Sequence, residues 1–560
     1  MREESDRRSL LLETGILAGL ALLVRLANLD HTAYVDELNH LIAAESLLRD
    51  GALLLESGVE YTRARFFTWL VAGSLLLFGE GLVSARIPAV LAGTLLVVVT
   101  FLWVRRSLGA WEGWTAGILV LLAPQAIYHS QIARFYSFQA LFVLGAAWCA
   151  WTLATRSRWS VRGVGVPLAL GALCGVGAMA VQISSLLGLA AIGLWLAVVL
   201  AIRLLRGELS PRFRIRVVGA LVVGVVVGTA WVVWSGTLAQ ALASFGHVGL
   251  WAESQAGNLR YYHYHLLSHY PVLWAAFPVI VLLALRRHPG LSSLWVTILG
   301  LVLVVHSLAA WKADRYIFYA LPFFFALVGM VVGALLRRIH QEFRDEIHHR
   351  FSLTTPSRTA TAGAGVVLAF CLFFAAWANP AFPYSARMIL GTDASWHFPV
   401  MYRGEADWRA TGEALGETLE QAEVVITSTE QKARYFLGRG EVILSRNYLG
   451  EDGSGTPNPQ FHRNDKTDVP VISEWESLEG IVACHRTGLV LVERNHWRQR
   501  WSVPDALADR IETLLDRVHL DDGWRIHGFE WDHGADFAPE RARCPDYTEP
   551  ISHLEGYRGR

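Results

Sequence analysis

The sequence predicts a polytopic α-helical membrane protein with about eleven transmembrane helices and a soluble α/β domain at its C-terminus. Hydrophobic residues make up 53% of the 560 residues and charged residues only 18%, whereas water-soluble domains carry about 25% charged residues. Apolar runs long enough to cross a bilayer recur as far as about residue 379. Beyond residue 380 the composition changes to alternating helix-like and strand-like segments. The formal net charge is zero, so no nucleic-acid partner is expected.

Eleven apolar runs are expected to cross the membrane, and they lie at about 10–29, 86–104, 111–128, 137–155, 163–181, 183–203, 216–235, 271–286, 292–311, 316–336 and 361–379. The run at 65–79 is shorter, and its length suits a helix that lies at the membrane interface. Arginine clusters decide this reading, because Lys and Arg in short loops favour the cytoplasmic side. With the N-terminus in the cytoplasm, the arginine clusters fall on the cytoplasmic side only if the segment 65–79 does not cross the membrane. No small-residue cleavage site follows the N-terminal residues, so the first run is expected to remain as a helix.

This count of spans divides the chain into two domains. Residues 1–379 form the transmembrane domain, with an outer loop at 30–85, and residues 380–560 form a soluble extracytoplasmic domain. Segment 404–445 has the pattern helix, strand, helix, strand, and "TGLVLVER" (487–494) reads as a further buried strand, which is typical of a parallel α/β sheet. Cys484 and Cys544 lie in this domain and could pair outside the cytoplasm. The protein is therefore expected in the plasma or inner membrane, with its chemistry on the outer face.

An adjacent acid pair, Asp36 and Glu37, follows the first span in "HTAYVDELNHLIAAESLLRDG" (31–51). If this stretch is helical, Asp36, Asn39 and His40 share one face, and Glu37 points beside them. A carboxylate beside an apolar interior loses hydration, so its pKa tends to rise and it becomes a better base. The pair is therefore a catalytic candidate. The alternative is that both residues are interfacial charges solvated by water.

Arginines gather in the segments predicted on the same outer face, and they are Arg63, Arg65, Arg86 and Arg134. Arg134 lies in "HSQIARFYSFQALF" between two spans, where a charge is costly unless it pairs or faces a polar cavity. The guanidinium group offers a fork of donors that fits phosphate oxygens. The alternative is that Arg134 merely pairs with Asp36 or Glu37, and both can hold in alternating states.

Two further outer segments carry polar side chains. In "WKADRYIFYALP" (311–322), Lys312, Arg315 and Tyr316 stand at the entrance to a helix and could hold a phosphate head group, or they could snorkel at the interface. In "YYHYHLLSHYP" (261–271), His265 and His269 have the i, i+4 spacing of metal ligands. An aromatic belt or a sugar or lipid groove also explains that segment. His40, His265 and His269 are accordingly candidates for an acceptor site or groove; no metal site is assigned, and a divalent metal is left open.

Together these residues predict an outer-face cavity with carboxylates at one point and cations around it. Such a cavity suits a lipid-phosphate-linked sugar donor, because cations would hold the departing phosphate while a carboxylate takes the proton of the attacking hydroxyl. The expected reaction is glycosyl transfer from a polyprenyl-phosphate sugar to a lipid, glycan or protein acceptor. A lipid-linked sugar flippase would also need a charged cavity, but it should show paired repeats and matching broken helices. A sensor whose C-terminal domain binds a ligand is the third reading.

The chain resembles the GT-C glycosyltransferases, especially the family 39-like group that contains protein O-mannosyltransferases and the lipid A aminoarabinose transferase. The resemblance covers about 15–335 and is carried by "YVDELNH" (34–40), "LFGEGLVSARIPAVLAGTL" (77–95), "LAPQAIYHSQIARFYSFQALF" (122–142) and "DRYIFYALP" (314–322). The family's first outer loop carries an Asp-Glu motif, which implies Asp36 as the catalytic base with Glu37 beside it. Its other motifs fall on Arg86, Arg134, Tyr136, Arg315, Tyr316 and Pro322.

This resemblance implies a GT-C fold, a donor of the undecaprenyl- or dolichyl-phosphate type, and inversion at the anomeric carbon by a single displacement. Metal dependence varies within this fold class. The chain departs from many members where it has "YTRARFF" (61–67) in place of a Pro-Pro pair before the interfacial helix. It also has Phe135-Tyr136-Ser137 where some members carry an Asp. These departures leave the acceptor and the details of donor binding open, but not the general class.

Overall fold

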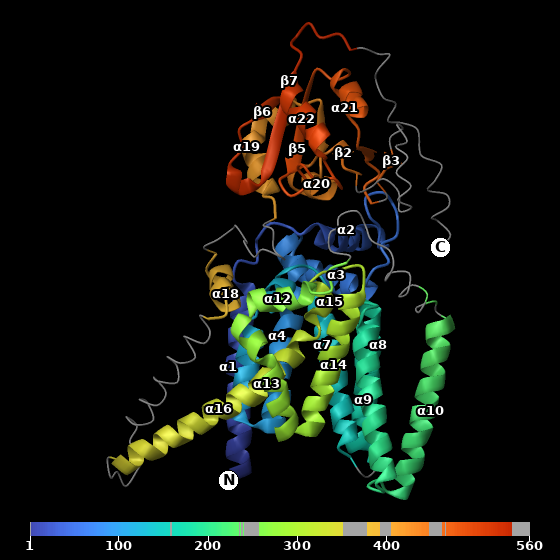
Figure 1. Ribbon diagram of the computed structural model, residues 1–560. Coiled ribbons are helices and arrows are strands. Elements are labelled where there is room, and N and C mark those ends of the chain that lie inside the picture. The colour runs from blue at the N-terminus through green and yellow to red at the C-terminus, as the bar shows by residue number, and fades with distance from the viewer. Residues whose placement is uncertain are drawn as a thin grey trace.

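The computed structural model describes residues 2–156, 160–234, 236, 239, 257–350, 378–391, 405–446, 462–464 and 466–539. An upright bundle of helices forms one part, and an α/β domain stands at one end of it (Figure 1). The bundle consists of α1 (Arg2–Leu26), α4 (Leu82–Leu108), α5 (Ala110–Leu121), α7 (Tyr136–Ala154), α8 (Val166–Val181), α9 (Ser185–Leu205), α10 (Pro211–Trp234), α13 (Pro271–Arg287), α14 (Pro289–Leu308) and α16 (Leu321–Arg350), with a π-helical turn, η1 (Val161–Gly165), before α8.

Seven helices in the described part of the chain are long and apolar enough to cross a membrane. An eighth is added if α12 (Tyr261–His269) and α13, which meet at an angle of 111°, count as one broken span. The single helix expected at 111–128 was wrong, because α5 ends at Leu121 and α6 (Pro124–Gln131) begins at Pro124. Proline lacks an N–H and starts a helix more readily than it continues one. The span expected at 361–379 lies almost wholly outside the described residues.

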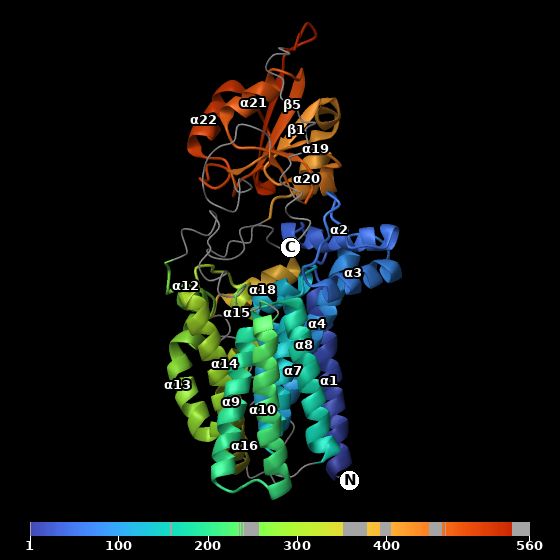
Figure 2. The same ribbon diagram turned by 90° about the vertical axis from the view of Figure 1, so that its right-hand side faces the viewer.

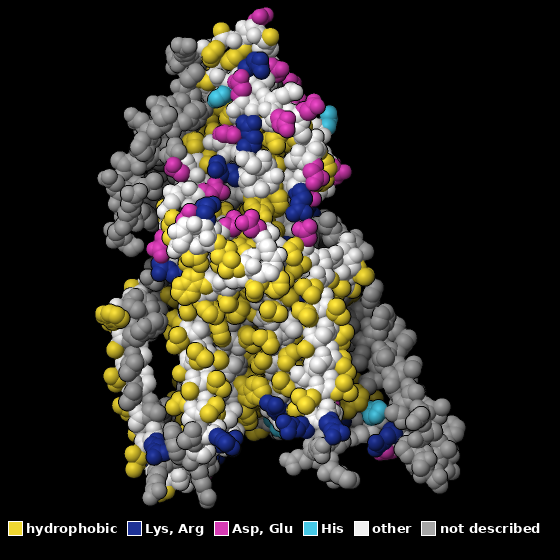
Figure 3. All heavy atoms as spheres, turned by 180° about the vertical axis from the view of Figure 1, so that it is seen from behind, with side chains coloured by type: hydrophobic (Ala, Val, Ile, Leu, Met, Phe, Trp, Pro, Cys, Tyr) yellow, Lys and Arg dark blue, Asp and Glu magenta, His cyan; other side chains and the backbone are white. Residues whose placement is uncertain are grey.

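Helices α5 and α16 pack closely through glycine. A Cβ atom added at Gly333 would lie 2.6 Å from the Glu112 backbone, and one at Gly329 would lie 2.7 Å from the Ala116 side chain. Small residues at such a contact let two membrane helices approach at backbone distance. At the same end, buried Glu112 pairs with Arg337 at 3.1 Å. Lys and Arg side chains gather at this end of the bundle, away from the α/β domain (Figure 3).

The other end of the bundle is covered by short helices, which are α2 (Val35–Asp50), α3 (Arg65–Phe78), α6, α12, α15 (Arg315–Phe318) and α18 (Ala381–Leu390). Helices α2 and α3 lie across the upright helices (Figure 2). Phe67, Val71 and Leu75 bury one face of α3, while Leu76 and Leu77 are exposed. Helix α3 therefore has the length and the two faces that an interfacial helix at 65–79 requires, and its depth in a bilayer stays a prediction.

The α/β domain contains α19 (Trp408–Gln421), β1 (Val424–Thr427), α20 (Glu430–Leu437), β2 (Val442–Leu444), β3 (His462–Arg463), β4 (Pro470–Ile472), α21 (Trp475–Val482), β5 (Thr487–Glu493), α22 (Asp505–Leu514), β6 (Asp516–Val518), the 3₁₀ turn η4 (Asp522–Trp524) and β7 (Ile526–Asp532). The strand order is β3-β4-β2-β1-β5-β7-β6. The helix and strand pattern expected over 404–445 and 487–494 is confirmed. Strands β4, β2, β1 and β5 are parallel, whereas β3, β7 and β6 pair antiparallel. The prediction of a parallel sheet was wrong at both edges of the sheet. Strands joined by a short connection, such as β6 and β7, pair antiparallel because a parallel pair needs a long crossover.

The sheet is buried on both faces because successive side chains of a strand point to opposite sides. Val424 and Ile426 pack with residues of α21 and α22, whereas Val425 packs with residues of α19 and α20. The two helix layers account for the continuous apolar runs that marked β1 and β5 in the sequence. Helix α20 then faces the bundle and lies against α2 (Figure 1).

Candidate functional site

Helix α2 places Asp36 at the end of the bundle that faces the α/β domain. Asp36 Oδ2 lies 3.2 Å from Nη2 of Arg134, and 24% of the Asp36 side chain is exposed while Arg134 is fully buried. Nη1 of Arg134 donates to the Asp36 carbonyl at 3.1 Å, and Nη2 donates to the Tyr136 hydroxyl at 3.1 Å. The guanidinium group also lies over the Phe135 ring at 4.9 Å. Arg134 is thus held in one orientation against the carboxylate.

Three more cations surround Asp36. Arg63 lies over the Phe135 ring at 5.6 Å, and Arg315 donates from Nη1 to the Tyr34 hydroxyl at 3.5 Å. Burial alone would raise the pKa of Asp36, but the charges of Arg134, Arg63, Arg315 and Lys466 hold that pKa well below its usual value. The raised pKa expected from burial was therefore wrong in sign, because nearby opposite charges outweigh lost hydration here. Asp36 is therefore ionised.

This cluster carries an excess of positive charge. Arg134 pairs with Asp36, but Arg63, Arg315 and Lys466 have no carboxylate within ion-pair distance in the part of the chain that the structure describes. Two carboxylates, Asp36 and the neighbouring Asp314, lie among four cations, so the site keeps an excess of positive charge that attracts an anion. Phosphate is the anion whose oxygens guanidinium groups match best.

Glu37 and Arg86 form a separate, closed pair beneath the cluster. Both side chains are fully buried, and Nε and Nη2 of Arg86 donate to the two carboxylate oxygens of Glu37 at 2.9 and 2.6 Å. Glu37 also accepts the backbone N–H groups of Tyr34 at 2.7 Å and Ala133 at 2.8 Å. Nη1 of Arg86 donates to the carbonyls of Leu29 and His31. Both carboxylate oxygens of Glu37 accept hydrogen bonds. Through these bonds the Glu37–Arg86 pair joins the start of α2 to the 132–135 segment and to α4.

Two other predicted phosphate ligands, Arg65 and Lys312, lie apart from this cluster, and a third, Tyr316, touches it only through Arg315, whose guanidinium group lies over the Tyr316 ring at 5.2 Å. Arg65 is exposed and pairs with Glu60 at 2.7 Å. Lys312 is buried and donates to the carbonyl of Ala309. The Tyr316 ring stacks on His306, with ring centroids 5.7 Å apart. None of these contacts joins them to Asp36.

The histidines lie on both sides of the cluster. His40 shares the Asp36 face of α2, and its Nδ1 lies 2.9 Å from the Thr68 hydroxyl. Burial, and then the charges of Arg134 and Arg63, hold the pKa of His40 well below its usual value, so its ring is neutral. His265 and His269 are buried in α12 with ring centroids 4.3 Å apart. In the described residues, no group of three or more His, Cys, Asp or Glu side chains could hold a metal ion.

Sequence reasoning missed three residues near this cluster. Tyr34 precedes the acid pair by one residue, so its place in "YVDE" was a signal. Asp314 precedes Arg315, and its Oδ2 lies 3.1 Å from Nε2 of His129. Burial would raise the pKa of Asp314, but the hydrogen bond with His129 and the neighbouring charges lower that pKa to about 2. Lys466 comes from the α/β domain, and nothing local in the sequence indicates its position.

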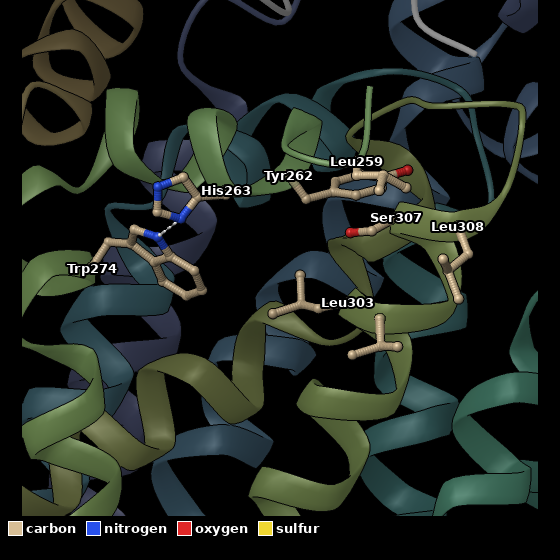
Figure 4. Close-up of a pocket in the computed structure, with 8 residues that line it drawn as sticks. Leu259, Tyr262, His263, Trp274, Leu303, Ser307 and Leu308 are labelled. Atoms are coloured by element: carbon tan, nitrogen blue, oxygen red, sulfur yellow. Dashed lines mark hydrogen bonds between the residues drawn. The ribbon is translucent and has the colours of Figure 1, made fainter. Parts of the chain in front are cut away.

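An apolar groove of about 270 Å³ lies between α12, α13 and α14 (Figure 4). Its lining residues are Leu259, Tyr262, His263, Trp274, Leu303, Val304, Ser307 and Leu308. Nε1 of Trp274 donates to Nδ1 of His263 at 2.9 Å. The Tyr262 hydroxyl donates to the Ala313 carbonyl at 3.1 Å, which connects the groove wall to the loop before Arg315.

Comparison with known proteins gives a partial match to one family profile and shows the fold. A profile of the family described as dolichyl-phosphate-mannose-protein mannosyltransferase matches residues 63–234, which include Arg63 and Arg134. No curated protein matches the sequence. The crystal structure of ArnT from Cupriavidus metallidurans in the apo state has a TM-score of 0.55 at 16% identity, covering 94% of this chain and 98% of that chain. The same protein bound to undecaprenyl phosphate has a TM-score of 0.56, with the same identity and coverage.

Proposed function

We propose that this chain, which has the GT-C glycosyltransferase fold, transfers a sugar from a polyprenyl-phosphate donor to an acceptor hydroxyl or amine on the outer face of the membrane. The observation that supports this most is the ionised Asp36 among four cations, three of which lack a carboxylate partner in the described residues. A phosphate placed there would satisfy those cations next to a base. The family profile and the ArnT structure bound to undecaprenyl phosphate agree with such a donor.

In the proposed reaction Arg134, Arg63 and Arg315 bind the donor phosphate. The acceptor oxygen or nitrogen attacks the anomeric carbon from the face opposite the phosphate. The bond between that carbon and the phosphate oxygen breaks, and its electron pair stays on the phosphate, whose new charge the arginines stabilise. The acceptor proton passes to Asp36. The products are an inverted glycoside and free polyprenyl phosphate.

The low pKa of Asp36 is set by the charges of the surrounding arginine and lysine side chains. A bound phosphate adds negative charge beside the same cations, and negative charge favours the protonated form of a carboxylate. Donor binding therefore raises the pKa of Asp36 and strengthens it as a base. It also draws Arg134 from the carboxylate, so that the oxygens of Asp36 can accept the acceptor proton.

Glu37 and Arg86 take a positioning role in this proposal. Their ion pair fixes the position of Asp36 relative to Arg134, because Glu37 adjoins Asp36 and accepts the N–H of Ala133 next to Arg134. Arg65 and Lys312 have partners of their own outside this arrangement, and Tyr316 touches it only through Arg315, so none of the three is assigned to the phosphate. Tyr136 orients Arg134 through its hydroxyl.

The proposed orientation puts the α/β domain outside the cytoplasm. Arginines gather at the opposite end of the bundle (Figure 3), as expected of a cytoplasmic face. Cys484 is disulfide-bonded, and disulfides persist in oxidising compartments. Cys544 lies outside the described residues.

The test is the release of free polyprenyl phosphate from a panel of polyprenyl-phosphate sugars by the purified protein in lipid. A membrane extract serves as the source of acceptor. We expect release with one donor, which would identify the sugar. No release with any donor would contradict the proposal and would favour transport of lipid-linked sugars, which sugar-lipid movement across sealed vesicles would then measure.

The apolar groove is the proposed place of the donor's polyprenyl chain. Val304 lines it and is 59% exposed, so Val304→Trp should fill part of it without disturbing the core. We expect KM for a long-chain donor to rise severalfold, because the indole ring would occupy space that the chain needs in the groove. A donor with two isoprene units should be used unchanged.

Val176→Trp is the matched control, because Val176 lies on α8 away from the groove and is 68% exposed. It should leave KM unchanged for both donors. An equal rise of KM for long and short donors in Val304→Trp would show that the chain lies elsewhere.

A further inference from the structure

The α/β domain is joined to α2 and to the outer loop by contacts of four kinds. Nε2 of Gln431, at the start of α20, donates to Oδ1 of Asn39 at 2.7 Å, and both side chains are buried. The N–H of Ser57 donates to the Lys466 carbonyl at 3.0 Å. Two ion pairs, Arg434–Glu56 at 2.5 Å and Arg409–Asp30 at 3.1 Å, and the packing of Tyr435 and Phe436 against the bundle complete the junction.

These contacts fix the position of α2, the helix that carries the proposed base. Asn39 lies on α2 three residues after Asp36, so the buried bond to Gln431 is made within one turn of the carboxylate. A buried amide pair of this kind is costly to break, because both groups would be left without partners. The α/β domain is therefore held against α2 within one turn of Asp36.

Lys466 comes from a tight turn between β3 and β4. Oδ1 of Asn464 accepts the N–H groups of Lys466 at 2.8 Å and Thr467 at 3.2 Å, and the N–H of Asn464 donates to the Val469 carbonyl at 2.8 Å. The turn is rigid by these bonds, and its contact with Ser57 holds it against the outer loop. The Lys466 charge lies near enough to lower the pKa of Asp36, and Lys466 has no ion-pair partner in the described residues.

We infer that the α/β domain completes the donor site, and that Lys466 is a phosphate-binding residue supplied by that domain. This inference rests on the proposed function. The donor phosphate carries one negative charge and the product phosphate up to two, so a further cation stabilises the state that forms as the sugar leaves. An ammonium group is a compact point charge that approaches one oxygen, which complements the planar forks of the arginines.

The test measures binding of undecaprenyl phosphate to the full-length purified protein, with Lys466→Ala, Lys466→Arg and the wild type side by side. We expect Lys466→Ala to weaken binding by about tenfold, the size expected for one charge-assisted hydrogen bond. Lys466→Arg should bind within about threefold of the wild type because it keeps the charge. The salt dependence of binding should be shallower in Lys466→Ala than in the wild type.

Two controls separate the phosphate role from docking and from total charge. Arg409→Ala removes one exposed ion pair of the junction, and Arg494→Ala removes a cation that pairs with Asp522 on the α/β domain. Both should bind undecaprenyl phosphate as the wild type does. Wild-type affinity in Lys466→Ala would overturn the inference, as would an equal loss in Lys466→Arg. Absence of binding by the wild type would instead contradict the proposed function.

Discussion

Asp36→Asn is expected to reduce sugar transfer by about 10²–10⁴-fold, which is the range that a positioned general base contributes. Asparagine keeps the size of the side chain but cannot accept the acceptor proton. The pair with Arg134 is lost, but Arg134 keeps its hydrogen bonds to the Asp36 carbonyl and to Tyr136, so its orientation should persist. The measurement is the initial rate of polyprenyl phosphate release at saturating donor.

Asp50→Asn is the matched control, because Asp50 lies at the other end of the same helix and pairs with Arg49 on the surface. It should turn over like the wild type. Binding of polyprenyl phosphate should survive in Asp36→Asn, since the cations remain and one competing carboxylate is gone. Normal turnover by Asp36→Asn would rule out Asp36 as the base.

Arg86→Met is expected to lower the free energy of unfolding by about 3–5 kcal/mol, the usual cost of removing one partner of a buried ion pair. Methionine has a similar length, so the loss comes mainly from Glu37, which would keep its charge in a fully buried position. The carbonyls of Leu29 and His31 would also lose their donor. Thermal unfolding of the purified protein in detergent measures this effect.

Arg65→Met makes the same substitution at an exposed pair and should change stability by less than about 1 kcal/mol. The comparison also tests the first interpretation of Arg86 as a phosphate ligand. If Arg86→Met unfolds like the wild type and loses affinity for polyprenyl phosphate, the phosphate role is right and the positioning role is not.

The sequence predicted those features that depend on local pattern. Long apolar runs identified the bundle, and alternating helix-like and strand-like segments identified the α/β domain. Both signals are patterns of consecutive residues. The proximity of Asp36 and Arg134 was also among the expected pairings, since a buried arginine next to a predicted outer loop needs an anion. The break after Leu121 has a local signal, because Pro124 lies inside the apolar run 111–128 and starts a new helix.

The remaining features depend on contacts between distant segments. Glu37 and Asp36 are neighbours in sequence, yet only one is enclosed by Arg86, and the rotation of α2 that decides this is set by packing. The sign of the pKa shift at Asp36 depends on four cations from four segments, including Lys466 of the other domain. No local sequence pattern shows the combined effect of these four charges on the pKa of Asp36. Burial alone therefore predicted a raised pKa.

The ion pair between Asp36 and Arg134 has a consequence for the end of each catalytic cycle. In the proposed reaction the spent lipid phosphate binds where Arg134 binds Asp36 at rest. The carboxylate is therefore a tethered competitor for the same guanidinium group, present at a high and constant effective concentration. It weakens the hold on donor and product alike, because part of their binding energy goes into displacing it. The competing carboxylate therefore speeds the release of a doubly charged product from a strongly cationic pocket, and faster release raises turnover.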